Sequence, residues 1–158
     1  MDGGIYCSIM VLNSVIERMG NRTLEPHELT LPQWLALGTV LHSGPEGVPH
    51  AQLGQRLMLS KAPVTGVVDR LERIGLVERH PDAKDRRISR VVGTKQGYDK
   101  WYEVKTTLSE KTDPDLDSCL TEDEQNQLLQ LLGRLLESFA PKDEAVAELI
   151  ARKEAGTK

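Results

Sequence analysis

Apolar residues recur at three- and four-residue spacings over several stretches of the chain, which is the pattern of amphipathic helices. The first stretch covers residues 5–19, and we expect its helix to end before Gly20-Asn21. A second helix is expected from residue 30, because Thr30 and Gln33 form a capping box, and Ser43-Gly44-Pro45 ends it. Since apolar residues cover much of the circumference of this second helix, it should be buried.

The middle of the chain contains a predicted short helix, a tight turn and a longer helix. The short helix covers residues 50–58, and the longer one starts at the cap Ser60 and ends at Gly75. Three apolar residues of the short helix should face inward: Ala51, Leu53 and Leu57. The inner face of the longer helix is formed by Val64, Val67, Val68, Leu71 and Ile74.

A β-hairpin follows the longer helix. Residues 76–80 and 88–92 have the composition and alternation of strands, and the polar residues 81–87 join them. Residues 47–49, before the short helix, are too few for more than an edge strand.

Helical spacing returns after the second strand. One helix is expected over residues 94–110, and Asp113-Pro114-Asp115 should break it. The capping box Thr121-Glu-Asp-Glu124 opens a leucine-rich helix that ends near residue 139. Residues 143–153 predict a short last helix.

The composition excludes several classes of protein. The chain has 158 residues, of which 39% are hydrophobic and only 4% aromatic, so it fits one compact unit with a core of aliphatic side chains. It lacks an apolar run of the roughly 20 residues that span a membrane, and we expect no signal peptide. Two cysteines are too few for a disulfide-dense secreted scaffold. We therefore expect a cytoplasmic protein without membrane association.

The net charge of −4 at first argues against binding to nucleic acid. Its distribution changes that conclusion, because residues 56–90 carry nine basic and five acidic side chains. Residues 1–55 and 113–158 are instead net negative. Since screening acts over about 10 Å at physiological salt, local charge matters more than the total, and the middle of the chain can meet an anion.

Short helix, turn, longer helix and hairpin is the order of a winged helix-turn-helix. We expect a mainly α fold with a small β-hairpin wing, in which the longer helix enters a DNA major groove. Exposed positions on such a helix should be small or able to form hydrogen bonds, as are Ser60, Lys61, Ala62, Pro63, Thr65, Gly66, Asp69 and Arg70. The wing tip adds Lys84, Arg86 and Arg87, and Asp85 can pair with Arg87 and fix the direction of its guanidinium.

Residues from about 31 to 97 resemble the MarR family of bacterial and archaeal transcriptional regulators. Three segments carry the resemblance: Leu76-Val-Glu-Arg79, Asp85-Arg-Arg87 and Val91-Val-Gly-Thr94-Lys-Gln-Gly97. The resemblance implies that residues 60–70 face the major groove and that Arg87, braced by Asp85, contacts the minor groove. The resemblance also implies that Arg79 either contacts a DNA phosphate or has a structural role within the lobe. Gly54 and Met58 depart from the residues frequent in the family, and either could shift the recognition helix slightly.

The resemblance also implies a homodimer whose first and last helices interlock while two winged lobes bind a pseudo-palindromic double-stranded DNA site. We divide the chain accordingly into residues 1–29 (dimerisation), 30–97 (DNA-binding lobe) and 98–158 (dimerisation). The apolar faces of the helices at 5–19 and 121–139 independently favour association, because they exceed what the central lobe can cover. The alternative is that both helices pack within one monomer.

Release from DNA by a small ligand or by oxidation is common among MarR-type regulators. Cys7 and Cys119 resemble the pair of the two-cysteine peroxide-sensing branch, in which Cys7 would be the peroxidatic and Cys119 the resolving thiol. The alternative is that they are two unrelated small residues.

Trp34 and His42 are candidates for a pocket that takes an aromatic or phenolic effector. The histidines lack metal-ligand spacing, so neither a metal nor a cofactor is expected.

The function that the sequence favours is a DNA-binding transcriptional regulator, most often a repressor in this family. A winged helix that binds another protein is the first alternative, against which the basic wing argues. An enzyme is the second, and it is disfavoured because no phosphate loop, metal cluster or nucleophile motif occurs.

Overall fold

The computed structural model describes residues 4–57, 61–143, 146–147 and 150–151, without the side chains of residues 61–62 and 109–118. The helices are α1 (Ile5–Leu24), α2 (Leu31–Leu41), α3 (His50–Arg56), α4 (Lys61–Arg73), α5 (Lys95–Cys119) and α6 (Glu122–Phe139), with single 3-10 turns η1 (Glu25–His27) and η2 (Ala140–Lys142). The strands are β1 (Val48–Pro49), β2 (Val77–Pro81) and β3 (Ser89–Gly93). The mainly helical fold with a β-hairpin wing is confirmed.

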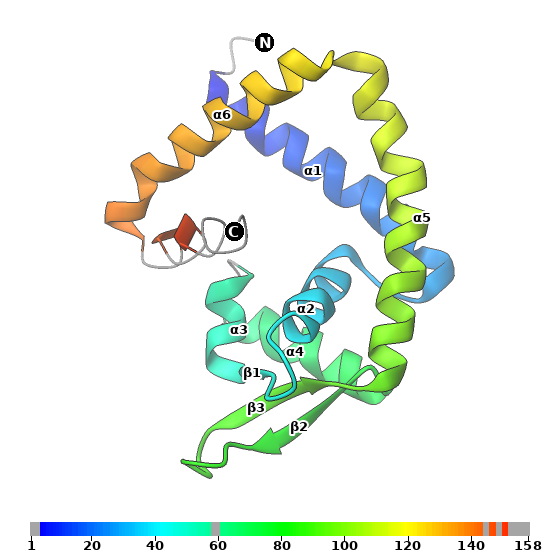
Figure 1. Cartoon of the computed structure of the whole chain (residues 1–158), viewed down its shortest axis with the longest axis vertical. Coiled ribbons are helices and arrows are strands. Elements are labelled where there is room, and N and C mark those ends of the chain that lie inside the picture. Colours follow the sequence, from blue (N-terminus) through cyan, green and yellow to red (C-terminus); the bar gives the residue numbers. More distant parts are fainter. Residues whose placement is uncertain (1–3, 58–60, 144–145, 148–149, 152–158) are drawn as a thin grey trace.

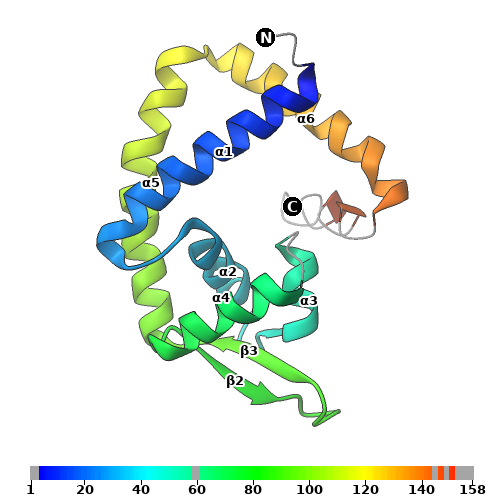
Figure 2. The ribbon, with the colours of Figure 1, turned by 180° about the vertical axis from the view of Figure 1, so that it is seen from behind.

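A winged lobe occupies one end of the molecule, and α5 rises from it toward α6 at the other end (Figures 1 and 2). In the lobe, α2, α3 and α4 pack together beside an antiparallel sheet of order β1-β3-β2. The register pairs Val77 with Gly93 and Pro81 with Ser89, and it places Pro49 of β1 opposite Arg90. The lobe core is aliphatic, as the composition predicted, and includes Leu37, Val40, Leu53, Val64, Val68, Leu71, Val77 and Val91.

The capping boxes are formed as predicted. Gln33 N donates to Thr30 Oγ1 at 3.4 Å, and the Gln33 side chain accepts from Thr30 N at 3.0 Å. Five of the eleven residues of α2 are buried, which confirms that it is a buried helix. Gly44 ends this segment with a φ of 82°, in the left-handed region that favours glycine.

Helix α1 continues to Leu24, so the prediction that it ends before Gly20 was wrong. A Cβ on Gly20 would lie 3.0 Å from Leu31 Cδ2, which shows that the glycine permits close packing against the start of α2. Asn21 Oδ1 accepts a hydrogen bond from Leu31 N at 2.7 Å and thereby caps α2. Both residues serve a contact between helices, which local pattern does not reveal.

Helix α5 also passes through a predicted break, because it runs to Cys119 across Asp113-Pro114-Asp115. A proline removes one backbone donor, but a long helix can retain its hydrogen bonds in the turns on both sides. The inward orientation predicted for Ala51 was wrong as well. In the short α3 the buried residues are Leu53 and Gly54, and Ala51 is exposed on another side.

Some predictions fall outside the described residues. They concern Met58, which departs from the residue frequent in the family, and Ser60, the predicted cap of the longer helix. Of the predicted last helix over residues 143–153, only residues 146–147 and 150–151 are described as helical.

A candidate nucleic-acid interface and an adjoining pocket

Helix α4 presents one apolar and one polar face. Val64, Val68 and Leu71 are buried against the lobe. Four predicted positions of the opposite face are exposed: Pro63, Thr65, Gly66 and Asp69. Arg70 is half-buried, Ser60 lies outside the described residues, and of Lys61 and Ala62 only the helical backbone is described. The described part of this face is therefore small and polar, and a groove-binding helix needs such a surface.

Arg79 on β2 is bonded to two carboxylates of α4. Its Nη2 donates to Asp69 Oδ1 at 2.5 Å, its Nη1 donates to Glu72 Oε2, and its backbone N donates to Glu72 Oε1 at 3.2 Å. Although burial lowers the pKa of the Arg79 guanidinium, the bonds to Asp69 and Glu72 outweigh it and raise that pKa above its ordinary value. In this structure Arg79 therefore ties the wing to α4.

The wing tip carries Arg87 in a fixed orientation. Its Nε and Nη2 donate to the two carboxylate oxygens of Asp85 at 3.0 and 2.9 Å, while its side chain remains 89% exposed. Hydrogen bonds from the side chain and backbone N–H of Arg87 hold the pKa of Asp85 below its ordinary range. The predicted pairing is thus present, and it aims a solvated guanidinium outward beside the exposed Lys84 and Arg86.

A second ion pair at the base of the wing was not singled out in the sequence. Arg90 Nη1 donates to Asp82 Oδ2 at 2.9 Å. The two residues lie eight positions apart on opposite sides of the wing tip, at a spacing that only the hairpin register brings together.

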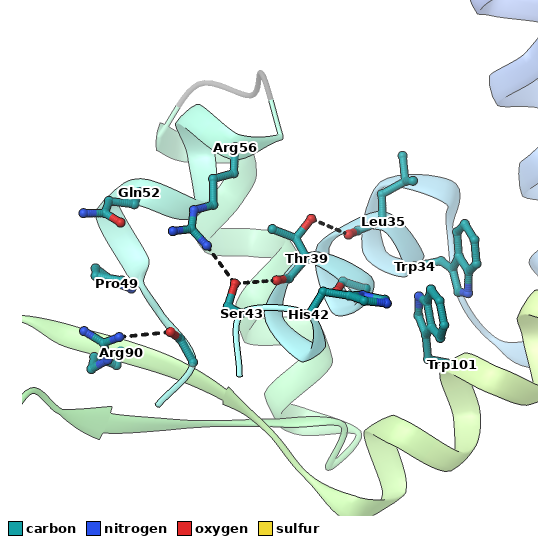
Figure 3. Close-up of a pocket in the computed structure, with 12 residues that line it drawn as sticks. Trp34, Leu35, Thr39, His42, Ser43, Pro49, Gln52, Arg56, Arg90 and Trp101 are labelled. Atoms are coloured by element: carbon teal, nitrogen blue, oxygen red, sulfur yellow. Dashed lines mark hydrogen bonds between the residues drawn. The ribbon is translucent and has the colours of Figure 1, made fainter. Parts of the chain in front are cut away.

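An open pocket of about 740 Å³ lies next to the wing (Figure 3). Trp34 and His42, the two residues predicted for a pocket, both line it. Trp101 of α5, which the sequence did not indicate, forms the wall with them. Its ring stacks on that of Trp34 at 5.6 Å between centroids and meets that of His42 edge-on at 4.8 Å. Trp101 fits here because residue 38 is a glycine. A Cβ at Gly38 would lie 2.5 Å from Trp101 Nε1.

The other side of the pocket is polar. Arg56 Nη1 donates to Ser43 Oγ, and Ser43 Oγ donates to the Thr39 carbonyl, both at 2.7 Å (Figure 3). Trp34 Nε1 is buried and finds no hydrogen-bond partner within the described parts of the chain. A stacked aromatic wall beside hydrogen-bond donors suits a planar aromatic molecule with a polar substituent.

Cys7 and Cys119 are both exposed. Cys7 lies beside Met10, Val11 and Ser14 in a shallow hollow on α1. Among the side chains that the structure describes, no cluster of His, Cys, Asp and Glu could hold a metal ion. No helix in the described ranges has both the length and the apolar character to cross a bilayer.

The profile of a family described as MarR matches residues 27–88. The "Transcriptional activatory protein BadR" of Rhodopseudomonas palustris is 35% identical over 89 residues, which are 56% of this chain and 51% of that protein. The match thus spans about half the length of this curated relative.

Three solved structures illustrate the similarity of fold. A probable transcriptional regulator from Pseudomonas aeruginosa has a TM-score of 0.75 and 29% identity, with 85% of this chain and 98% of that one covered. A single-site mutant of MarR from E. coli complexed with operator DNA has a TM-score of 0.76 and 25% identity, with 83% and 92% covered. The organohalide-sensing regulator RdhR in its 2,4-dichlorophenol-bound form has a TM-score of 0.75, with 87% and 80% covered, and at 21% identity it shows the fold alone.

Proposed function

Because the chain belongs to the MarR family, we propose that it is a transcriptional regulator that binds specific sites on double-stranded DNA through its winged lobe. The observation that carries the proposal is the wing tip, where Asp85 holds the exposed Arg87 in a fixed direction. A preoriented guanidinium suits the narrow minor groove, where the electrostatic potential is most negative. The exposed face of α4 would then lie in the adjacent major groove, which is about 12 Å wide.

The residues that we propose for this interface come from α4, the segment before it, and the wing. They are Ser60, Lys61, Ala62, Pro63, Thr65, Gly66, Arg70, Arg79, Lys84, Asp85, Arg86 and Arg87. Arg79 and Asp85 would act by holding α4 and Arg87 in place, since both are occupied by bonds within the lobe.

We propose that two copies associate through their chain ends, residues 1–29 and 98–158, and present the lobes 30–97 to a pseudo-palindromic site. Exposed apolar side chains on α1 and α6 support this assembly, since monomers rarely leave faces of this kind in water. On α1 they are Ile5, Tyr6, Met10, Val11, Leu12, Ile16 and Met19, and on α6 they are Leu128, Leu129, Leu131, Leu132 and Leu136.

We further propose that an aromatic or phenolic effector enters the pocket of Trp34, His42 and Trp101 and releases the protein from DNA. The expected outcome of DNA binding is repression. A reporter gene behind the protein's own promoter distinguishes this outcome from activation, the activity for which the R. palustris relative is named.

The test of DNA binding is a gel shift with the region upstream of the protein's own gene. Arg87→Ala should weaken binding by about 1–3 kcal/mol, because it removes the minor-groove contact. Binding should also weaken steeply with added salt, since phosphate contacts release counterions. Lys100→Ala removes a basic side chain of α5 outside the proposed interface, where Lys100 pairs with Glu103, and should leave affinity unchanged.

Two results would contradict the proposal. Specific binding that is insensitive to Arg87→Ala would show that the wing does not contact DNA. A folded protein that binds no DNA would favour the alternative of a winged helix that contacts another protein.

Oxidative release is a second candidate, favoured by the exposed Cys7 within the apolar face of α1. If Cys7 of one copy reacts with Cys119 of another, peroxide-treated protein should run as a crosslinked dimer on a non-reducing gel. Cys7→Ser and Cys119→Ser should each abolish the dimer band. Protein that stays monomeric on the gel after peroxide would remove this candidate.

A further inference from the structure

Arg90 is bonded on two opposite sides at the base of the wing. Toward the tip, its Nη1 donates to Asp82 Oδ2 at 2.9 Å. Away from the tip, its Nε donates to the Glu46 carbonyl at 2.6 Å and its Nη2 to the Gly47 carbonyl at 3.0 Å. The Arg90 side chain is only 22% exposed. All three guanidinium nitrogens are thus used inside the lobe, so the residue is poorly placed to contact DNA itself.

Asp82 connects this guanidinium to the wing tip. Its Oδ1 accepts hydrogen bonds from the backbone N–H groups of Lys84 at 2.8 Å and Asp85 at 3.1 Å. These two bonds, followed by the one from Arg90, hold the pKa of Asp82 below its ordinary value. One carboxylate oxygen therefore shapes the turn that leads to Arg87, and the other is bonded to Arg90.

The carbonyls on the other side belong to a loop that is itself held close to β3. Gly47 has a φ of 62°, and a Cβ at this position would collide with the carbonyl oxygen of Val91. The loop is closed by a bond from Gly47 N to the Gly44 carbonyl at 3.0 Å. The Glu46 and Gly47 carbonyls, which accept the hydrogen bonds from Arg90, therefore belong to a loop that is held in place against β3.

We propose that Arg90 is a positioning residue that ties the wing to the loop before β1 and thereby sets where Arg87 points. A two-stranded ribbon is only marginally stable by itself, so a tip that must meet a narrow groove benefits from such a tie. The planar guanidinium can donate in both directions at once, whereas a lysine ammonium on its flexible stem cannot reproduce that fork. This inference rests on the proposed binding of DNA by the wing.

The variant Asp82→Asn distinguishes a positioning role of Asp82 from a purely electrostatic effect of its charge on DNA binding. The removal of a negative charge near DNA should strengthen binding if only charge matters. If Asp82 holds Arg90 and the tip together, the same change should weaken binding roughly tenfold, which corresponds to about 1.4 kcal/mol. Glu78→Gln removes an equally negative side chain from β2, one that is 64% exposed against 16% for Asp82, and it should leave binding unchanged or slightly stronger. Binding that strengthens in Asp82→Asn as it does in Glu78→Gln would overturn the proposal.

Arg90 itself is tested by Arg90→Met and Arg90→Lys, each made alone and together with Arg87→Ala. Alone, both should lower affinity roughly tenfold, because neither can make the double-sided bonds. On the Arg87→Ala background the further loss should be about twofold or less, since the side chain being positioned is gone. Additive losses, or wild-type affinity of Arg90→Lys, would show instead that Arg90 acts through its charge on DNA.

A measurement without DNA keeps this inference separate from the proposed function. Amide hydrogen exchange at residues 82–88 should be faster in Arg90→Met than in the wild type, while the thermal unfolding midpoint confirms that the variant is folded. If the wild type binds no DNA, the proposed function fails, and exchange at residues 82–88 alone decides whether Arg90 holds the wing tip in place. If the wild type binds and Arg87→Ala weakens it, but Asp82→Asn and Arg90→Met do not, only the inference about Arg90 fails.

Discussion

Among single residues, Gly38 determines how closely α2 and α5 approach in the pocket wall. Trp101 Nε1 occupies the space where a side chain at this position would start. The indole ring of Trp101 is in turn held between Trp34 and His42. Any larger residue at position 38 therefore has to push Trp101 outward or move a helix.

We expect Gly38→Ala to destabilise the fold by about 1–3 kcal/mol, as overpacked core substitutions do. Urea unfolding followed by circular dichroism measures this change. Gly66→Ala is the matched control, because apart from the backbone of α4 itself no heavy atom of the described residues lies within 4 Å of a Cβ there. Alanine is the better helix former, so the control should be stabilised by up to about 1 kcal/mol. Equal stability of the two variants would contradict the close contact at Gly38.

The sequence predicted part of this residue-level picture. Trp34 and His42 could be nominated because both belong to the second helix, His42 near its end, and the resemblance to the MarR family implied an effector pocket beside that helix. Trp101 could not, because its place opposite them depends on how α5 packs across the lobe. For Arg79 a usable indication existed: Asp69 and Glu72 lie three positions apart, so they share a face of α4. Their common partner became clear only from the position of β2.

Among the elements, α6 starts with a complete capping box. Glu124 N donates to Thr121 Oγ1 at 3.4 Å, and a Glu124 carboxylate oxygen accepts from Thr121 N at 2.8 Å. Hydrogen bonds from the Thr121 backbone and hydroxyl hold the pKa of Glu124 below its ordinary value. The ionised carboxylate is thus the form that supports the helix.

We expect Thr121→Ala to cost about 1 kcal/mol of stability at neutral pH through loss of the cap. Because the folded-state pKa of Glu124 is depressed, its contribution is fully present above the unfolded-state pKa and is lost as pH falls through the folded-state pKa. The difference between wild type and variant should therefore shrink in acid. Urea unfolding at neutral pH and at successively lower pH measures it, and a difference that grows in acid would contradict this role of Glu124.

Element starts could be predicted better than element ends. The capping boxes depend on residues three positions apart, so sequence alone locates the starts of α2 and α6. The helix ends predicted before Gly20 and before the break at Asp113-Pro114-Asp115 were wrong, since neither Gly20 nor Pro114 is a sufficient local stop. Gly20 serves a contact with Leu31, and Pro114 lies inside a helix long enough to continue past it.

At the scale of the whole molecule, the wing and the pocket share residues. Arg90 and Gly47, which form the tie at the base of the wing, also line the pocket. In Figure 3 Arg90 lies on the side away from the stacked rings of Trp34 and Trp101. A molecule that stacks on the tryptophans and extends across the pocket would therefore meet the group that holds the wing. This arrangement provides a physical route from the proposed effector site to the proposed DNA contact.

The proposed dimer would have to bury apolar side chains of the chain ends. The exposed leucines there lie within a segment that is net negative. Leu129 on α6 is 62% exposed within one chain, so it contributes little to the stability of the monomer. Leu129→Glu should leave that stability within about 0.5 kcal/mol, as is usual for surface substitutions. In a dimer that buries this face, the same change places an unpaired carboxylate in an apolar interface and should favour dissociation.

Sedimentation equilibrium measures the outcome, and we expect wild type to be dimeric and Leu129→Glu to shift toward monomer. Ile88→Glu is the control, because Ile88 is also exposed, at 41%, but lies on the wing. It should leave the dimer intact. Since two linked lobes bind two half-sites more tightly than separate lobes do, Leu129→Glu should also weaken operator binding although it is far from the wing. A Leu129→Glu protein that stays dimeric would show that this part of α6 lies outside the interface.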